Sequence, residues 1–156
     1  MQAVVYRHYG LPDVLHVEEI AKPTPRADEV LVKVQAVSVN RSDWEGLLGK
    51  PLYARFGGML KPGRRILGSD IAGRVEAVGG NSRQFQPGDA VFGDILPRMG
   101  GFAEYVCARE RDLALIPAGM TFETAAAIPQ AGVIALQGVR EEGKGQAGQT
   151  VLINGG

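Results

Sequence analysis

Glycine and proline interrupt this chain at short intervals along most of its length. Its 156 residues include 22 glycines and nine prolines, which are spread between apolar runs instead of being collected in one tract. Glycine adds backbone freedom and proline removes a backbone donor, so each of them tends to end a helix or a strand. The sequence therefore predicts many short strands joined by turns.

The segment 30–40 shows the kind of element that lies between these interruptions. Val30, Val32 and Val34 lie on one side of an alternating pattern and Lys33 lies on the other, which is the period of a strand with one buried face. Comparable short runs occupy residues 2–6, 14–20, 67–80, 85–95 and 100–117. About six or seven such strands, with turn signals between them, are typical of a small β-barrel or sandwich.

Residues 41–66 depart from this alternation. They hold five glycines and two prolines, so we expect a long surface loop with one short helical turn over 42–48. Long loops on a strand scaffold often carry function. The basic residues at 61–65 have two interpretations, a phosphate-attracting loop or simply solvated charge, and we favour solvated charge.

The pattern changes again after residue 117. Residues 118–145 are rich in alanine and repeat apolar side chains every three to four positions, which predicts one or two helices. Thr121 or Thr124 can cap the first helix, and Pro129 should kink or split the run. Residues 150–154 then have the composition of a buried strand that leads into glycine, as at the start of a mononucleotide-binding unit.

Charge and cysteine content narrow the function. Seventeen basic and 17 acidic residues give a formal net charge of zero, and no long basic run is present, so nucleic acid is not an expected partner. We expect a small neutral or locally anionic ligand instead. Cys107 is the single cysteine, which excludes an internal disulfide and suits a reducing compartment. The first residues contain no signal peptide or membrane span, so we expect a cytoplasmic protein.

Six stretches of the sequence resemble, in the same order, those of the medium-chain dehydrogenases/reductases, most closely the zinc-independent, quinone-oxidoreductase-like branch. They are VSVNRSDW, LGSDIAGRVEAVG, FQPGDAVFG, GGFAEYV, AAAIPQAGVIALQGV and GQTVLINGG. The resemblance implies a mainly β fold, with a GroES-like β-barrel in residues 1–120. It also implies connecting helices and the first strand of a Rossmann domain in residues 121–156. Because the rest of that cofactor domain is absent, we expect a truncated part of a longer enzyme.

The resemblance also bears on metal binding. In the zinc-bearing branch a cysteine occupies the place of Asn40, and a histidine–glutamate pair occupies the place of Ser69 and Asp70. A catalytic zinc needs three protein ligands such as Cys, His or a carboxylate, and neither Asn40 nor Ser69 is a suitable ligand. We therefore expect no metal.

Several residues are implied as site residues by the same resemblance. Asn40 and Asp43 are expected at the catalytic cleft, where the Asn40 amide can reach the substrate or the nicotinamide ribose, and Ser42 and Trp44 are expected to line the substrate pocket. An asparagine at the end of a strand also commonly caps a turn with its own side chain, so Asn40 has a purely structural interpretation as well.

Cofactor contacts are implied in the last part of the chain. Ile134 stands where many relatives carry a threonine that approaches the nicotinamide, and Gln130 or Gln137 can substitute for that contact. Gly155 and Gly156 are expected to begin the turn that holds the pyrophosphate. Cys107 and the two histidines, His8 and His16, are expected to be structural or surface residues.

The implied activity is hydride transfer from NADPH or NADH to quinones or α,β-unsaturated carbonyl compounds without zinc. The isolated chain should bind the cofactor poorly and show no turnover. The alternative is a non-enzymatic GroES-like module for binding or oligomerisation. An unpaired strand at 150–154 and an apolar helix face favour a homo-oligomer.

Overall fold

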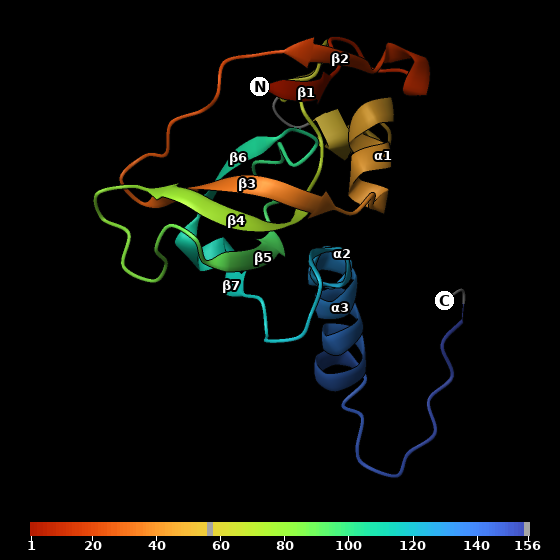
Figure 1. Ribbon diagram of the computed structural model, residues 1–156. Coiled ribbons are helices and arrows are strands. Elements are labelled where there is room, and N and C mark those ends of the chain that lie inside the picture. Colours follow the sequence, from red (N-terminus) through yellow and green to blue (C-terminus); the bar gives the residue numbers. More distant parts are fainter. Residues whose placement is uncertain (56–57, 155–156) are drawn as a thin grey trace.

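The computed structural model describes residues 1–55 and 58–154 (Figure 1). Its main sheet has five antiparallel strands in the order β6–β3–β4–β5–β7. These strands are β3 (Glu29–Val37), β4 (Asp70–Val78), β5 (Ala90–Asp94), β6 (Tyr105–Arg109) and β7 (Ala114–Leu115). A separate antiparallel pair is formed by β1 (Gln2–Val5) and β2 (His16–Glu19). The prediction of a mainly β fold built from short strands is confirmed.

The barrel expected from the resemblance is not closed. Strand β6 pairs with β3 and β7 pairs with β5, and in the described part of the chain the two outer strands do not pair with each other. The reason is the length of β7, because two residues offer too few backbone groups to continue the ladder around to β6. The sheet is therefore strongly curved but open.

Irregular pairing between β3 and β4 increases this curvature. The register shifts between Leu31 and Val32 and again between Val34 and Ala36. Gly73 lies opposite the second shift, where an added Cβ would stand 2.2 Å from a backbone carbonyl oxygen of β3. The close approach requires glycine at this position, and bulges of this kind bend a strand and sharpen its twist.

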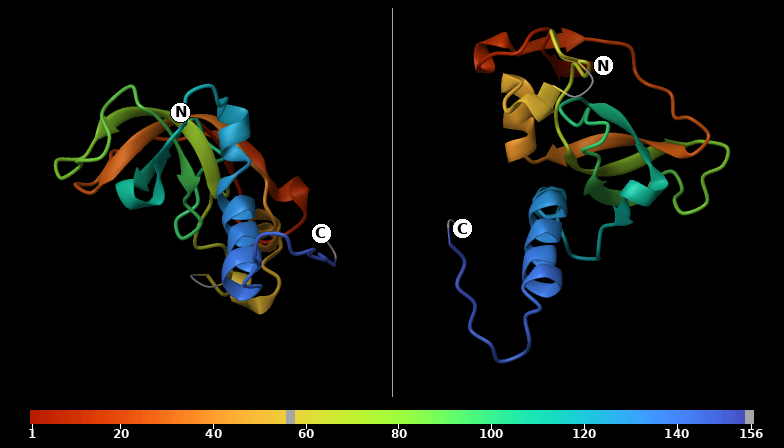
Figure 2. Two further views of the ribbon diagram at one scale, coloured as in Figure 1. Left: turned by 90° about the horizontal axis from the view of Figure 1, so that it is seen from below. Right: turned by 180° about the vertical axis from the view of Figure 1, so that it is seen from behind.

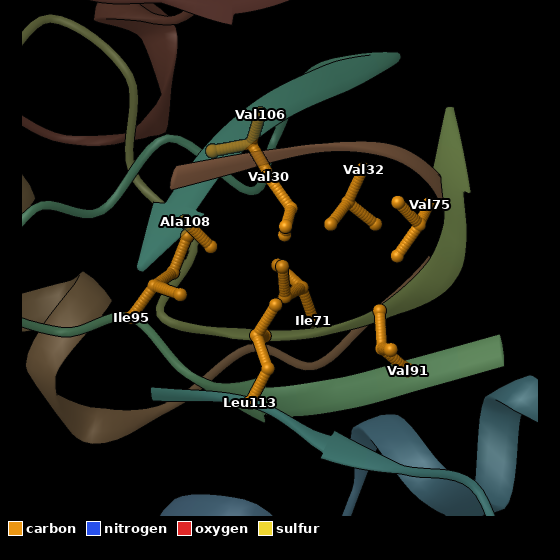
Figure 3. Close-up of a cluster of buried hydrophobic side chains, with 9 residues drawn as sticks. All are labelled: Val30, Val32, Ile71, Val75, Val91, Ile95, Val106, Ala108 and Leu113. Carbon is orange, nitrogen blue, oxygen red and sulfur yellow. The ribbon is translucent and has the colours of Figure 1, made fainter. Parts of the chain in front are cut away.

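The core lies inside the curve of the main sheet (Figure 3). Its nine buried side chains are Val30, Val32, Ile71, Val75, Val91, Ile95, Val106, Ala108 and Leu113. Ile71 and Val75 point into this core from β4, and Ala72 between them points to the opposite face. The alternation seen in the sequence thus describes a sheet that is covered on both sides.

Two short helices follow β7; the first covers the outer face of β4, and the second extends away from the sheet (Figure 1). They are α2 (Phe122–Ala126), which packs Ala125 and Ala126 against Ala72, and α3 (Pro129–Leu136), extended by a π-helical stretch, η4 (Gln137–Glu142). Thr121 caps α2, since its Oγ1 accepts a hydrogen bond from the Thr124 N–H at 3.2 Å. Pro129 begins α3, so the predicted split at this proline is confirmed.

Helix α1 (Arg41–Leu48) follows β3 directly. It ends at Gly49, whose φ of 61° is left-handed. Its buried residue Leu47 joins a second cluster of apolar side chains with Tyr6, Val14, Leu67 and Met99. This cluster fixes α1 between the β1–β2 pair and the main sheet (Figure 1). The described residues also form three short 3₁₀ helices: η1 (Pro12–Val14), η2 (Leu52–Arg55) and η3 (Glu110–Asp112).

The last described residues leave the sheet altogether (Figure 2). The expected strand at 150–154 is not formed, and Leu152 in this segment is 92% exposed. A strand needs hydrogen bonds from a neighbouring strand, and no strand of the described residues lies beside this segment. No helix in the described ranges is long and apolar enough to span a membrane.

Candidate functional site

Asn40 lies where β3 passes into α1. Its backbone is extended, with φ −111° and ψ 167°, and it is the residue that precedes the first turn of the helix. Its Nδ2 donates hydrogen bonds to the Oγ atoms of Ser38 at 3.1 Å and Ser69 at 3.2 Å. Ser69 is fully buried, so the Asn40 amide is held in one orientation at the surface of the fold.

Asp43 lies beneath this junction and is buried. Its Oδ2 accepts a hydrogen bond from the Asn40 N–H at 2.8 Å, and its Oδ1 accepts one from the Gly68 N–H, also at 2.8 Å. Burial raises the pKa of the Asp43 carboxyl above its ordinary value against the effect of these two N–H groups. Because both carboxyl oxygens accept hydrogen bonds from backbone N–H groups, Asp43 holds the site in place and does not point into an open cleft.

Asp70, the first residue of β4, is fully buried beside Ser69. Its Oδ2 accepts a hydrogen bond from the Gln130 N–H at 2.9 Å, and its Oδ1 has no partner among the described residues. Burial raises the pKa of this carboxyl, against the lowering effect of the Gln130 N–H and the nearby Asn40 amide, and the charges of Asp94 and Asp43 also raise it. Asp70 therefore favours its protonated form more strongly than an exposed aspartate does.

A side-chain bridge connects α1 to α3 across the same region. The Ser42 hydroxyl donates to the Gln130 Oε1 at 3.1 Å. Gln130 thus forms a hydrogen bond to α1 through its side chain and a hydrogen bond to β4 through its backbone N–H. Ile134 lies one turn further along α3, on the same face as Gln130, and is 63% exposed. The structure brings Asn40, Ser42 and Gln130 together, with Ile134 at the margin.

The other predicted site residues are Trp44, Gly155 and Gly156. Trp44 is 43% exposed on α1 and does not line the cavity of about 410 Å³ that opens beside this helix. Gly155 and Gly156 lie outside the described residues. Cys107 lies in β6, and burial raises the pKa of its thiol to about 11, so it is not a reactive thiolate at neutral pH.

The donor set does not suit a zinc ion. In the residues that the structure describes, no group of three or more His, Cys, Asp or Glu side chains is placed to hold a metal. His8 and His16 are both exposed. At the junction itself the available groups are an amide, hydroxyls and the carboxyls of Asp43 and Asp70, and both oxygens of Asp43 already accept backbone N–H groups. This set lacks the cysteine and histidine ligands that are typical of zinc sites.

A cavity of about 410 Å³ opens beside α1. Ser42 lines it, so the cavity adjoins the Asn40 junction, and three tyrosines that sequence reasoning missed form much of its wall: Tyr6, Tyr9 and Tyr53. No periodic pattern connects these positions, because Tyr6 and Tyr9 lie in the segment between β1 and β2, and Tyr53 lies in the segment after α1. Arg64 also lines the cavity, and its side chain is exposed, as expected for the basic segment 61–65.

Residues 26–118 match the family model described as the alcohol dehydrogenase GroES-like domain. The open curved sheet and the polar junction between β3 and α1 thus define a domain of the GroES-like class. The chain belongs to the alcohol dehydrogenase GroES-like domain family, in the quinone-oxidoreductase-like branch of the medium-chain dehydrogenases/reductases.

Individual relatives agree with this assignment. The chain is 35% identical to a 2-methylene-furan-3-one reductase of Solanum lycopersicum over 100% of its own length and 41% of that protein. It is 34% identical to an NADPH-dependent alkenal/one oxidoreductase of Arabidopsis thaliana, covering 100% of the chain and 41% of that protein. The solved quinone oxidoreductase of Coxiella burnetii aligns with a TM-score of 0.84 at 28% identity, over 94% of this chain and 46% of that one. The chain spans less than half the length of these proteins.

Proposed function

We propose that this chain forms the substrate-side part of an NADPH- or NADH-dependent oxidoreductase that transfers hydride to quinones or α,β-unsaturated carbonyl compounds. The observation that carries the proposal is the Asn40 amide, fixed by Ser38 and Ser69 beside a cavity of about 410 Å³. The names of the three similar proteins support the cofactor and the class of acceptor.

The residues of the junction fit the amide-bearing end of a nicotinamide cofactor. A bound reduced nicotinamide would supply the hydride, and the protein would supply position and hydrogen bonds. Asn40 has an amide of fixed orientation to offer to the substrate or to the cofactor ribose, and Ser42 and Gln130 hold α1 against α3 around it. Asp43 acts as a positioning residue, because it contacts only backbone N–H groups. Ile134 offers an apolar contact in line with Gln130, and Trp44 lies at the outer margin of the site.

We propose that the reaction proceeds without zinc. Zinc normally polarises a carbonyl oxygen, but a quinone or an enone already has a delocalised acceptor for hydride. Hydrogen bonds from fixed amide and hydroxyl groups are then sufficient to orient the acceptor. Dialysis of the complete enzyme against a chelator should leave its rate of quinone or enone reduction unchanged.

We also propose a division of the chain into a GroES-like catalytic part, residues 1–120, and a connecting part, residues 121–156. The pyrophosphate contacts that we expect at Gly155 and Gly156 belong to the connecting part. A neutral net charge and a single cysteine support a cytoplasmic protein with a small-molecule substrate. The exposed apolar side chains on α3 support self-association, which light scattering can test.

A fusion provides the test of the activity. The remainder of the Coxiella burnetii quinone oxidoreductase would be joined after residue 156, and oxidation of NADPH would be followed with a quinone or an enone as acceptor. We expect turnover in the fusion, a large loss with Asn40→Ala, and none in the 156-residue chain alone. A fusion that binds NADPH but reduces neither acceptor would refute the proposal. In that case the alternative, a GroES-like binding module, would take its place.

A further inference from the structure

The cavity beside α1 is apolar although three tyrosines line it. Tyr6 and Tyr9 donate their hydroxyls to backbone carbonyl groups at 3.3 and 2.6 Å, and Tyr53 donates its hydroxyl to Glu45 at 2.7 Å. The polar ends of all three side chains are therefore engaged within the protein itself. The parts of these side chains that are left to line the cavity are the rings, and the faces and edges of aromatic rings favour flat, apolar ligands.

This wall is formed in advance of any ligand. Tyr6, Leu67 and Met99 belong to one buried cluster, with 3%, 3% and 9% of their surfaces exposed. The guanidinium of Arg55 lies over the ring of Tyr9 at 4.8 Å, which supports that ring from behind. A volume of about 410 Å³ falls within the usual range of small-molecule sites. A ligand of one or two fused rings fits such a space.

Two charged residues line the cavity, and they differ in their partners. The Glu45 carboxylate is already engaged, since it accepts from the Arg41 Nε at 2.9 Å and from the Tyr53 hydroxyl. Arg64 forms no ion pair in the part of the chain that the structure describes, and it donates one Nη2 hydrogen bond to the carbonyl of Pro97. A guanidinium carries five N–H donors, so most of those of Arg64 remain for a ligand.

The sequence around Arg64 is basic as well. Between residues 46 and 69 the chain carries five basic residues and no acidic one. They are Lys50, Arg55, Lys61, Arg64 and Arg65. An unpaired guanidinium at the edge of an apolar cavity is suited to bind a carboxylate or phosphate group, often with two parallel hydrogen bonds.

We propose that this cavity binds a substrate with a flat apolar body and an anionic substituent, and that Arg64 binds the anion. The tyrosine rings hold the body, and Ser42 marks the side of the cavity that faces Asn40. Calling this ligand the substrate rests on the function proposed above. The binding itself does not, because it needs neither the cofactor nor hydride transfer.

Three probes of equal shape test the proposal in the 156-residue chain: naphthoate, naphthamide and naphthylmethylammonium, which are anionic, neutral and cationic. None of them is a hydride acceptor of the proposed kind. Binding would be followed by NMR chemical-shift titration at low ionic strength, with the shifts expected at residues that line the cavity. We expect naphthoate to bind about ten-fold more tightly than naphthamide, as for one charge-assisted contact. The ammonium probe should bind most weakly, and added salt should reduce the advantage of the anion.

Three variants assign the effect to Arg64. Arg64→Gln should abolish the preference for naphthoate while leaving naphthamide binding intact, and Arg64→Lys should retain part of the preference. Arg65→Gln is the matched control, because Arg65 is the adjacent cation and does not line the cavity. The thermal midpoint of each variant would establish that it is folded.

Three outcomes would overturn the proposal. They are equal affinity for naphthoate and naphthamide, chemical shifts away from the cavity, and an equal loss in Arg64→Gln and Arg65→Gln. These outcomes are separate from failure of the fusion enzyme, which would remove the proposed reaction but not the anion site.

Discussion

The buried carboxyl of Asp70 leads to a prediction about the pH dependence of stability. Replacing Asp70 by Asn keeps the size of the side chain and an oxygen that accepts from the Gln130 N–H, a bond of 2.9 Å in the native protein. It removes the charge next to Asp43 and Asp94. In the orientation that keeps an oxygen next to the Gln130 N–H, the new NH2 group takes the place of the other carboxyl oxygen, which has no partner among the described residues.

The sign of the effect follows from the raised pKa of Asp70. Above the unfolded value of about 3.9, the folded protein keeps the Asp70 proton when the unfolded chain has lost it. The stability that this proton contributes is complete below that pH and is lost as the pH rises through the folded pKa. Asp70→Asn has no such proton to lose. Its free energy of unfolding should therefore increase relative to that of the native protein as the pH rises, by about 1.4 kcal/mol for each unit by which the pKa is raised.

A third protein separates charge from hydrogen bonding. Asp70→Ala leaves the Gln130 N–H without its acceptor, so at every pH it should be less stable than Asp70→Asn by about 1–3 kcal/mol. Urea unfolding followed by circular dichroism across a pH series measures all three free energies. The exposed Asp13 gives a control, since Asp13→Asn should change stability by less than about 0.5 kcal/mol. A difference between Asp70→Asn and the native protein that is constant or falls as the pH rises would refute the reasoning.

Three further predictions concern packing, backbone geometry and association. Ile71→Ala should lower the free energy of unfolding by about 2–5 kcal/mol, because this side chain is fully buried in the core, whereas Val17→Ala at a 68% exposed position should have little effect. Gly68→Ala should destabilise by more than about 1 kcal/mol, because φ is +96° there and an added Cβ would stand 2.6 Å from a backbone nitrogen, whereas Gly80→Ala meets nothing within 4 Å. Light scattering should show self-association at high concentration that Leu136→Glu weakens, since Leu136 is 55% exposed on α3; a strict monomer would contradict this.

The strands were predictable from the sequence because alternation is a local property. The valines of β3 identify a strand whatever its neighbours are, and Pro129 splits the helical segment by its own chemistry. Closure of the sheet depends instead on the length of β7, which no local pattern reports. The strand expected at 150–154 shows the same limit, because its composition is that of a strand but pairing requires a partner.

The site was predictable only in part for a similar reason. Asn40 and Ser42 were recognised through their motif, and both lie at the junction. The burial of Asp43 was not foreseen, since one of its two partners, Gly68, is 25 positions away. Tyr53 and Arg64 become neighbours of the first strand pair only through the path of the loop that carries them.

The hydrogen bonds of Asp43 also divide the site into two parts, the Asn40 junction and the loop that follows α1. Its carboxylate connects Asn40 to Gly68, so the loop between α1 and Gly68 leaves and returns at fixed points. Lengthening a loop with fixed ends costs little, about 0.6 kcal/mol for each doubling of its length. That loop carries Tyr53 and Arg64, and Asn40 lies outside it. Under the proposed function, exchange of this loop is therefore a route to new ligand preferences that leaves the Asn40 junction unchanged.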